Sequence, residues 1–126
     1  TVHACTDVTG FSFLGHLHEM MDGRLSCIIE SKQVPVMEPA LAYADEFLLT
    51  AAAQRNRNQT EKFVQFENIP FAMEEVLYDP QTSGGLLAAV APECAQQLLQ
   101  ELREAGMPAA IVGEIVEQRE KEIYVL

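Results

Sequence analysis

Basic side chains are scarce in this chain, and their scarcity argues against one class of partner. Only 8 of the 126 residues are Lys or Arg, against 19 Asp and Glu, which gives a net charge of −11 at neutral pH. Proteins that bind nucleic acids neutralise backbone phosphates with Lys and Arg, so we expect no nucleic-acid partner. A nucleotide ligand is still compatible with acidic charge, because Mg²⁺ can bridge carboxylates and phosphates.

Cysteine is also rare, and occurs only at Cys5, Cys27 and Cys94. The odd number and the lack of a CxxC pair indicate neither a disulfide framework nor a zinc knuckle. This usage is typical of a reducing, cytoplasmic setting. Cys27 and Cys94 lie in apolar surroundings and are predicted to be core thiols. Cys5 lies on a predicted strand and is expected to be buried rather than reactive.

Long apolar runs are absent as well. None approaches the ~20 residues needed to span a membrane, and no signal peptide is visible, so we expect no membrane partner. The chain is 48% hydrophobic, its mean hydropathy is +0.03, and its length suffices for a single domain with a core, residues 1–126. It starts in mid-strand without Met, as we expect of the C-terminal half of a larger two-domain protein.

Hydrophobic periodicity predicts strands that alternate with helices. The expected strands are 2–6, 25–30, 63–66, 86–90, 109–116 and 123–126. The expected helices are 11–21, 37–49, 70–78 and 92–105, while residues 54–60 are expected as a loop or a fraying helix end. This order is typical of an α/β or α+β domain whose helices pack on a sheet.

The run from Asp79 to Gly85, DPQTSGG, is the most informative stretch. Its Asp-Pro and Ser-Gly steps predict a turn. Gly84 and Gly85 allow positive φ and the close approach of another group. Thr82 and Ser83 add hydroxyls beside free backbone N–H groups, and such a loop can hold an anion. A plain tight turn before a strand is the alternative, and the loop alone favours it.

A second segment, TDVTGF, runs from Thr6 to Phe11 between a predicted strand and a predicted helix. Asp7 therefore lies at a strand end, where ligands of α/β proteins often bind. A helix cap is the alternative role for Asp7 and for Thr9.

The histidines do not form a recognisable metal motif. His3, Cys5 and Asp7 would share one strand face at a spacing of about 6–7 Å, which disfavours a shared zinc. His16 and His18 lack the i, i+4 spacing of zinc proteases. His16 is predicted to be a helix-face or packing residue.

Together, TDVTGF…LGHLHEM and DPQTSGGLL resemble the signature stretches of selenophosphate synthetase, also called selenide, water dikinase. The resemblance covers the whole chain and extends to a superfamily that includes aminoimidazole ribonucleotide synthetase. The chain departs from the family at Ser12, where the family usually has Gly. It also departs at Thr50 to Ala53, where a Gly-Gly usually precedes the Arg-Asn run. Alanines there favour an extended helix and leave the roles of Arg55 and Arg57 open.

The resemblance implies a fold and an activity. The fold would be α+β, a three-layer α/β/α sandwich with a mixed sheet. The whole enzyme would use Mg²⁺ to convert ATP, selenide and water into selenophosphate, AMP and orthophosphate. Asp7 would bind the metal. The residues expected near the phosphates are Thr9, Gly10, Thr82, Ser83, Gly84 and Gly85.

The resemblance also implies what this chain lacks. The family's nucleophile and its partner Lys belong to the N-terminal half, so we expect no catalytic residue here and no activity of this chain alone. The N-terminal half would be the partner, in a homodimer of the full-length enzyme. Two alternatives remain: another ATP-using enzyme of the superfamily, or a non-catalytic binding module with the same fold.

Overall fold

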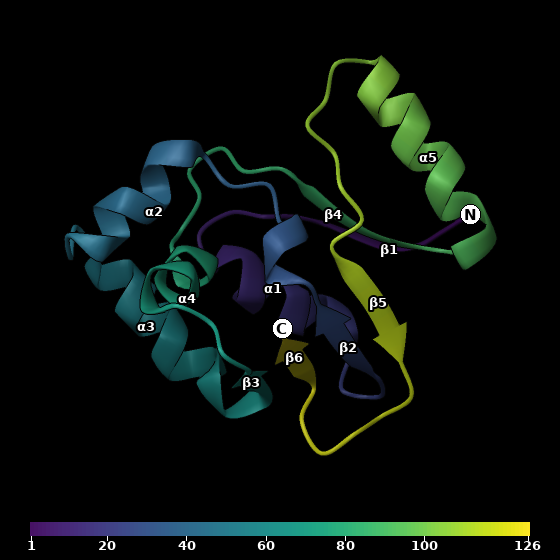
Figure 1. The fold of residues 1–126 in the computed structure, drawn as a ribbon. Helices are drawn as coiled ribbons and strands as arrows, with labels where there is room; N and C mark the ends of the chain where they lie inside the picture. The colour runs from purple at the N-terminus through teal and green to yellow at the C-terminus, as the bar shows by residue number, and fades with distance from the viewer.

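The computed structural model describes residues 1–126 (Figure 1). Its strands are β1 (Val2–Asp7), β2 (Ser26–Ile29), β3 (Val64–Phe66), β4 (Leu86–Val90), β5 (Gly113–Val116) and β6 (Ile123–Val125). Its helices are α1 (Ser12–Met21), α2 (Glu38–Asp45), α3 (Ala51–Thr60), α4 (Phe71–Tyr78) and α5 (Pro92–Glu104). Short 3₁₀ turns occupy Ser31–Gln33 and Glu61–Phe63.

The strands form two separate sheets. Four of them make a mixed sheet in the order β3-β6-β2-β5, in which β6 is parallel to both neighbours and β5 is antiparallel to β2. β1 and β4 form an antiparallel two-stranded ribbon. Helices α1 to α4 gather on one side of the molecule, and α5 stands at the far end of the ribbon (Figure 1). The predicted α+β class with a mixed sheet is confirmed.

One hydrophobic core joins the sheet, the ribbon and two helices. In α1, Leu14, Leu17 and Met21 are buried on the face that helical periodicity predicts. Val8 and Leu87 belong to the same core, so the ribbon is anchored next to the two sequence motifs. Twelve buried side chains form this cluster: Val8, Leu14, Leu17, Met21, Cys27, Ile29, Val64, Leu77, Tyr78, Leu87, Ile123 and Val125.

The middle of the chain differs from the predicted elements in two places. The helix expected over 37–49 ends at Asp45, because Phe47 adopts a φ of +60° and Leu48 N donates to Tyr43 O at 3.0 Å, as in a Schellman motif. Residues 54–60, expected as a loop or a fraying end, are instead the body of α3. Thr50 caps this helix by accepting a hydrogen bond from Ala53 N at 3.1 Å. The helix extension expected from the alanines is therefore present.

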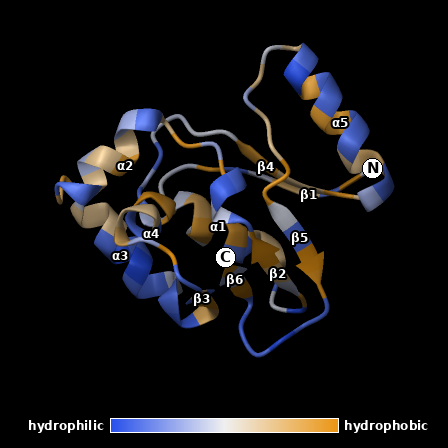
Figure 2. Cartoon of the chain, in the orientation of Figure 1, coloured by the Kyte–Doolittle hydropathy of each residue, from blue (hydrophilic) through white to orange (hydrophobic).

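The strand expected over 109–116 begins only at Gly113, because its partner β2 pairs through Ile29 and the chain then turns at Ser31. The helix α5 carries apolar and polar residues on opposite sides (Figure 2). None of its residues is buried. No helix has both the length and the apolar composition needed to cross a membrane.

Burial in the structure tests the three cysteine predictions. Cys27 is buried in the core as predicted, and burial, followed by the nearby Glu122 charge, raises the pKa of its thiol to about 12. The prediction that Cys94 is a core thiol is wrong: it is only partly buried, because it lies on α5, which has no buried residue. The prediction that Cys5 is buried is wrong: the side chain is exposed, because β1 belongs to a two-stranded ribbon with an uncovered face.

Tyr78 is a core residue whose hydroxyl has no hydrogen-bond partner, although the side chain is 0% exposed. Burial raises the pKa of this hydroxyl to about 12. We expect Tyr78→Phe to leave the free energy of unfolding unchanged or to raise it, because the substitution removes an unpaired buried polar group. Tyr78→Ala, the control, should lose ~3–5 kcal/mol through the cavity it creates. Urea denaturation would measure both, and a Tyr78→Phe loss near that of the alanine variant would contradict this account.

Candidate functional site

The ribbon brings the two sequence motifs side by side. In its register Asp7 pairs with Leu86, so TDVTGF leaves one strand where DPQTSGG enters the other. Two backbone hydrogen bonds continue the pairing beyond the strands. Val8 N donates to Gly85 O at 2.8 Å, and Gln81 N donates to Thr9 O at 2.9 Å. The segments 6–11 and 79–85, which are far apart in the sequence, thus lie side by side, and we call them together the double loop.

Gly84 is the tightest point of this double loop. A Cβ placed on Gly84 would lie 1.9 Å from the backbone oxygen of Val8, a distance that real atoms do not reach. The expected close approach is therefore present. The expected positive φ is not found at Gly84 or Gly85, since the glycines with positive φ are Gly23 and Gly106. Glycine is needed here for space and not for backbone handedness.

Ser12 adopts a backbone conformation that glycine would adopt without strain. Its φ is +73°, a left-handed conformation that costs an L-residue ~1–2 kcal/mol. Ser12 Oγ accepts a hydrogen bond from Gly15 N at 3.3 Å and so serves the first turn of α1. Neither Asp7 nor Thr9 caps this helix through its side chain, so the capping alternative for both residues is wrong.

Asn56 links the first loop to the end of α4, the helix that leads into the second loop. This residue of α3 is 6% exposed, and its Nδ2 donates to Gly10 O and to Tyr78 O, each at 3.0 Å. Thr50, the cap of the same helix, donates to Asp79 Oδ1 at 3.0 Å. Sequence reasoning missed Asn56 because residues 54–60 were expected to be irregular. The available signal was the position of Asn56 between Arg55 and Arg57, if that run is taken as a helix.

Arg57 joins α3 to α4 and does not face the loops. Its guanidinium donates to Glu74 at 3.0 Å and to Glu75 at 2.7 Å, and lies 4.7 Å from the centre of the Tyr78 ring. Burial lowers the pKa of Arg57, but the hydrogen bonds and charges of the two carboxylates outweigh it and raise the pKa overall. Arg55 is exposed and has no ion-pair partner.

His16 lies against the turn that follows β1. Its Nε2 is 2.9 Å from Thr9 Oγ1 and accepts from Phe11 N at 3.3 Å, while its Nδ1 is 3.1 Å from Glu19 Oε1. The sequence predicted only a helix-face or packing residue. His16 does lie on α1 and packs against Phe11, and its ring also binds the turn of the double loop.

Asp7 ends β1 with an exposed carboxylate that makes no hydrogen bond or ion pair. The residues predicted to lie near phosphates are accessible: Gly10, Thr82, Ser83, Gly84 and Gly85 are exposed, and Thr9 is half-buried. Nowhere do three His, Cys, Asp or Glu side chains converge to hold a metal. Carboxylate and hydroxyl oxygens suit Mg²⁺, but an ion held at Asp7 would need further ligands from elsewhere.

Comparison with known proteins identifies the family. The family model described as AIR synthase related protein, C-terminal domain, matches residues 1–126. The chain belongs to this family. It is 60% identical over 125 residues to a selenide, water dikinase of Agathobacter rectalis, covering 98% of this chain and 36% of that protein. A selenide, water dikinase of Desulfitobacterium hafniense strain Y51 is 46% identical over 118 residues, covering 94% and 35%.

These comparisons bear out the resemblance predicted from the two motifs. A third relative, a selenide, water dikinase of Clostridioides difficile, is 41% identical over 128 residues, covering 99% of this chain. The chain spans only about 36% of the length of such relatives. This chain therefore corresponds to one part of each of these longer relatives.

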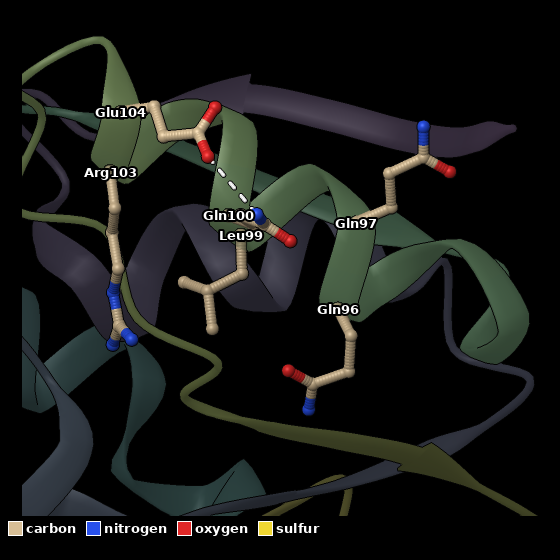
Figure 3. A pocket seen from close by; sticks show the side chains of 6 residues that line it. All are labelled: Gln96, Gln97, Leu99, Gln100, Arg103 and Glu104. Atoms are coloured by element: carbon tan, nitrogen blue, oxygen red, sulfur yellow. Dashed lines mark hydrogen bonds between the residues drawn. The ribbon is translucent and has the colours of Figure 1, made fainter.

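A separate hollow of about 600 Å³ lies beside α5 in this domain, away from the double loop. Figure 3 shows Gln96, Leu99 and Arg103 pointing to one side of the helix, while Gln100 donates to Glu104 at 3.0 Å on another. The hollow is lined by residues of one helix, Gln96, Gln97, Leu99, Gln100, Arg103 and Glu104. It contains none of the predicted site residues.

The two adjacent glycines supply a matched test of the double loop. Gly84→Ala should destabilise the domain by ~1–3 kcal/mol, because the new methyl group collides with the Val8 carbonyl. Gly85→Ala should change the free energy of unfolding by less than ~0.5 kcal/mol, since no atom lies within 4 Å of a Cβ there. Chemical denaturation of both variants measures the difference. Equal effects would show that the loops do not touch in this way.

Proposed function

We propose that this chain is the C-terminal domain of a selenophosphate synthetase. The whole protein would convert ATP, selenide and water into selenophosphate, AMP and orthophosphate. The observation that carries this proposal is the backbone pairing of TDVTGF with DPQTSGG, which puts an unpaired carboxylate next to an exposed hydroxyl- and glycine-rich loop. The identity to proteins named selenide, water dikinase supports the choice of substrate.

Each loop has its own task in the proposed site. Asp7 would hold Mg²⁺, because its carboxylate is exposed and free of any other partner. The ion supplies charge neutralisation to the transferring phosphoryl groups. The hydroxyls of Thr82 and Ser83 and the N–H groups up to Gly85 would contact phosphate oxygens, as turn backbones do in other anion sites. Gly84 keeps this loop close enough to Val8 for both tasks to serve one ligand.

The remaining chemistry would come from the rest of the protein. No thiol here is suited to capture selenium. Cys27 is buried, and burial raises its pKa to about 12. Cys5 lies on the ribbon outside both loops, and Cys94 lies on α5 at the far end of that ribbon. We therefore place the nucleophile and most nucleotide contacts in an N-terminal half. This chain alone would be inactive, and the full-length enzyme would work as a cytoplasmic homodimer.

Two other functions would use the same geometry. A different ATP-using enzyme of the superfamily would keep the metal carboxylate and change the second substrate. A non-catalytic module would keep the double loop without turnover. The complete DPQTSGG run beside TDVTGF favours the selenium enzyme over both.

Asp7→Asn in the full-length protein separates a metal role from a structural one. We expect the melting temperature to stay nearly constant, since exposed substitutions away from special contacts cost less than ~0.5 kcal/mol. The Mg²⁺-dependent formation of AMP from ATP and selenide should fall by more than ~10-fold, because even the outer shell of a metal site is worth about that.

Asp45→Asn is the matched control, since Asp45 is an exposed aspartate of α2 without an ion pair. It should retain both stability and activity. Near-normal activity of Asp7→Asn would remove Asp7 from the metal site. Activity of the unaltered protein with ATP but not with selenide would favour another enzyme of the superfamily.

A further inference from the structure

The imidazole of His16 contacts a backbone N–H group, a hydroxyl and a carboxylate. Phe11 N lies 3.3 Å from Nε2, Thr9 Oγ1 lies 2.9 Å from Nε2, and Glu19 Oε1 lies 3.1 Å from Nδ1. The His16 side chain is only 12% exposed. The Phe11 ring, 5.4 Å from the imidazole centre and tilted to it, covers one side.

These contacts decide where the ring proton lies. A backbone N–H can only donate, so Nε2 of His16 must carry a lone pair toward Phe11. A carboxylate can only accept, so Nδ1 must carry the hydrogen toward Glu19. The hydrogen-bond network therefore assigns the ring hydrogen to Nδ1.

The same assignment decides the direction of the Thr9 hydrogen bond. If Nε2 carries no hydrogen, its 2.9 Å contact with Thr9 Oγ1 is a hydrogen bond only when the hydroxyl donates its single proton, so the Nε2 lone pair is shared between Thr9 and Phe11. Thr9 Oγ1 then has only lone pairs left for a ligand. Lone pairs suit a cation or the hydrogen of a bound water, whereas a phosphate oxygen needs a donor.

We infer that His16 is a positioning residue that commits the Thr9 hydroxyl as an acceptor, and so assigns Thr9 to the cation side of the double loop together with Asp7. This inference rests on the proposed function for the identity of the ligands. It revises the expectation from the sequence, in which Thr9 was grouped with the phosphate-side residues. Thr82 and Ser83 keep that role, because neither hydroxyl is engaged within the protein.

The tautomer is measurable without any activity. Histidine ¹⁵N spectra of this chain, with the His16 signals identified by their loss in His16→Gln, should show a protonated Nδ1 and an unprotonated Nε2. Thr9→Val should shift the Nε2 signal and leave Nδ1 protonated. A hydrogen on Nε2 would overturn the inference whatever reaction the protein performs, which separates this test from that of the proposed function.

The role toward the cation is tested in the full-length protein. His16→Leu and Thr9→Val should each raise the Mg²⁺ concentration needed for half-maximal activity by ~10-fold, with little change in the KM for ATP. The double variant should be no worse than either single one, because the two residues act as one unit. His16→Gln, whose amide oxygen can accept from Thr9, should recover most of the loss.

The Mg²⁺ dependence of activity and the KM for ATP, measured in the same variants, can also overturn the inference. A rise in the KM for ATP at unchanged Mg²⁺ dependence would put Thr9 on the phosphate side and overturn the inference. Changes in melting temperature alone, with both dependences intact, would reduce His16 to a structural residue and overturn it as well.

Discussion

The site depends on the antiparallel pairing of β1 with β4 and its continuation between the loops. Val8 N to Gly85 O and Gln81 N to Thr9 O are backbone hydrogen bonds, each worth ~0.5–1.5 kcal/mol net. A two-stranded ribbon alone is marginally stable in water. Val8 and Leu87 bury its loop end in the core, and Gly84 allows the loop to reach the Val8 carbonyl.

Polar contacts from α3 make this arrangement specific. With one amide group, Asn56 binds the Gly10 carbonyl of the first loop and the Tyr78 carbonyl at the end of α4, just before the second loop. Arg57 fixes α3 to α4 through two carboxylates. The Arg57 side chain is 18% exposed and that of Glu75 is 6% exposed, so this ion pair is largely shielded from water. The double loop is thus held from below by the core and from behind by a helix whose inner face is polar.

Much of this could be read from the sequence. The periodicity of α1 and the apolar strand after DPQTSGG gave their positions within a residue, and the two motifs identified the family. The role of Asn56 could not be predicted, because its two partners are backbone carbonyls from distant segments. Cys5 was wrongly expected to be buried. Its side chain is exposed because β1 pairs only with β4. The positive φ of Ser12 was also hidden, because serine seldom adopts it.

The predicted metal and phosphate residues lie together because of tertiary pairing and not because of local pattern. Neither motif contains the information that Gly84 meets Val8, since that contact arises only when β4 pairs in register with β1. The long-range register also explains why His16 was undervalued. Its partners Thr9 and Phe11 are near in sequence, but their orientation depends on the turn that the double loop imposes.

Hydrogen–deuterium exchange of the full-length protein, with and without Mg²⁺ and a non-hydrolysable ATP analogue, tests most directly whether the two loops act as one binding unit. The account predicts that ligand slows exchange together in residues 6–12 and 79–86, while α5 is unchanged. Slowing in only one of the two loops, or mainly in α5, would contradict it.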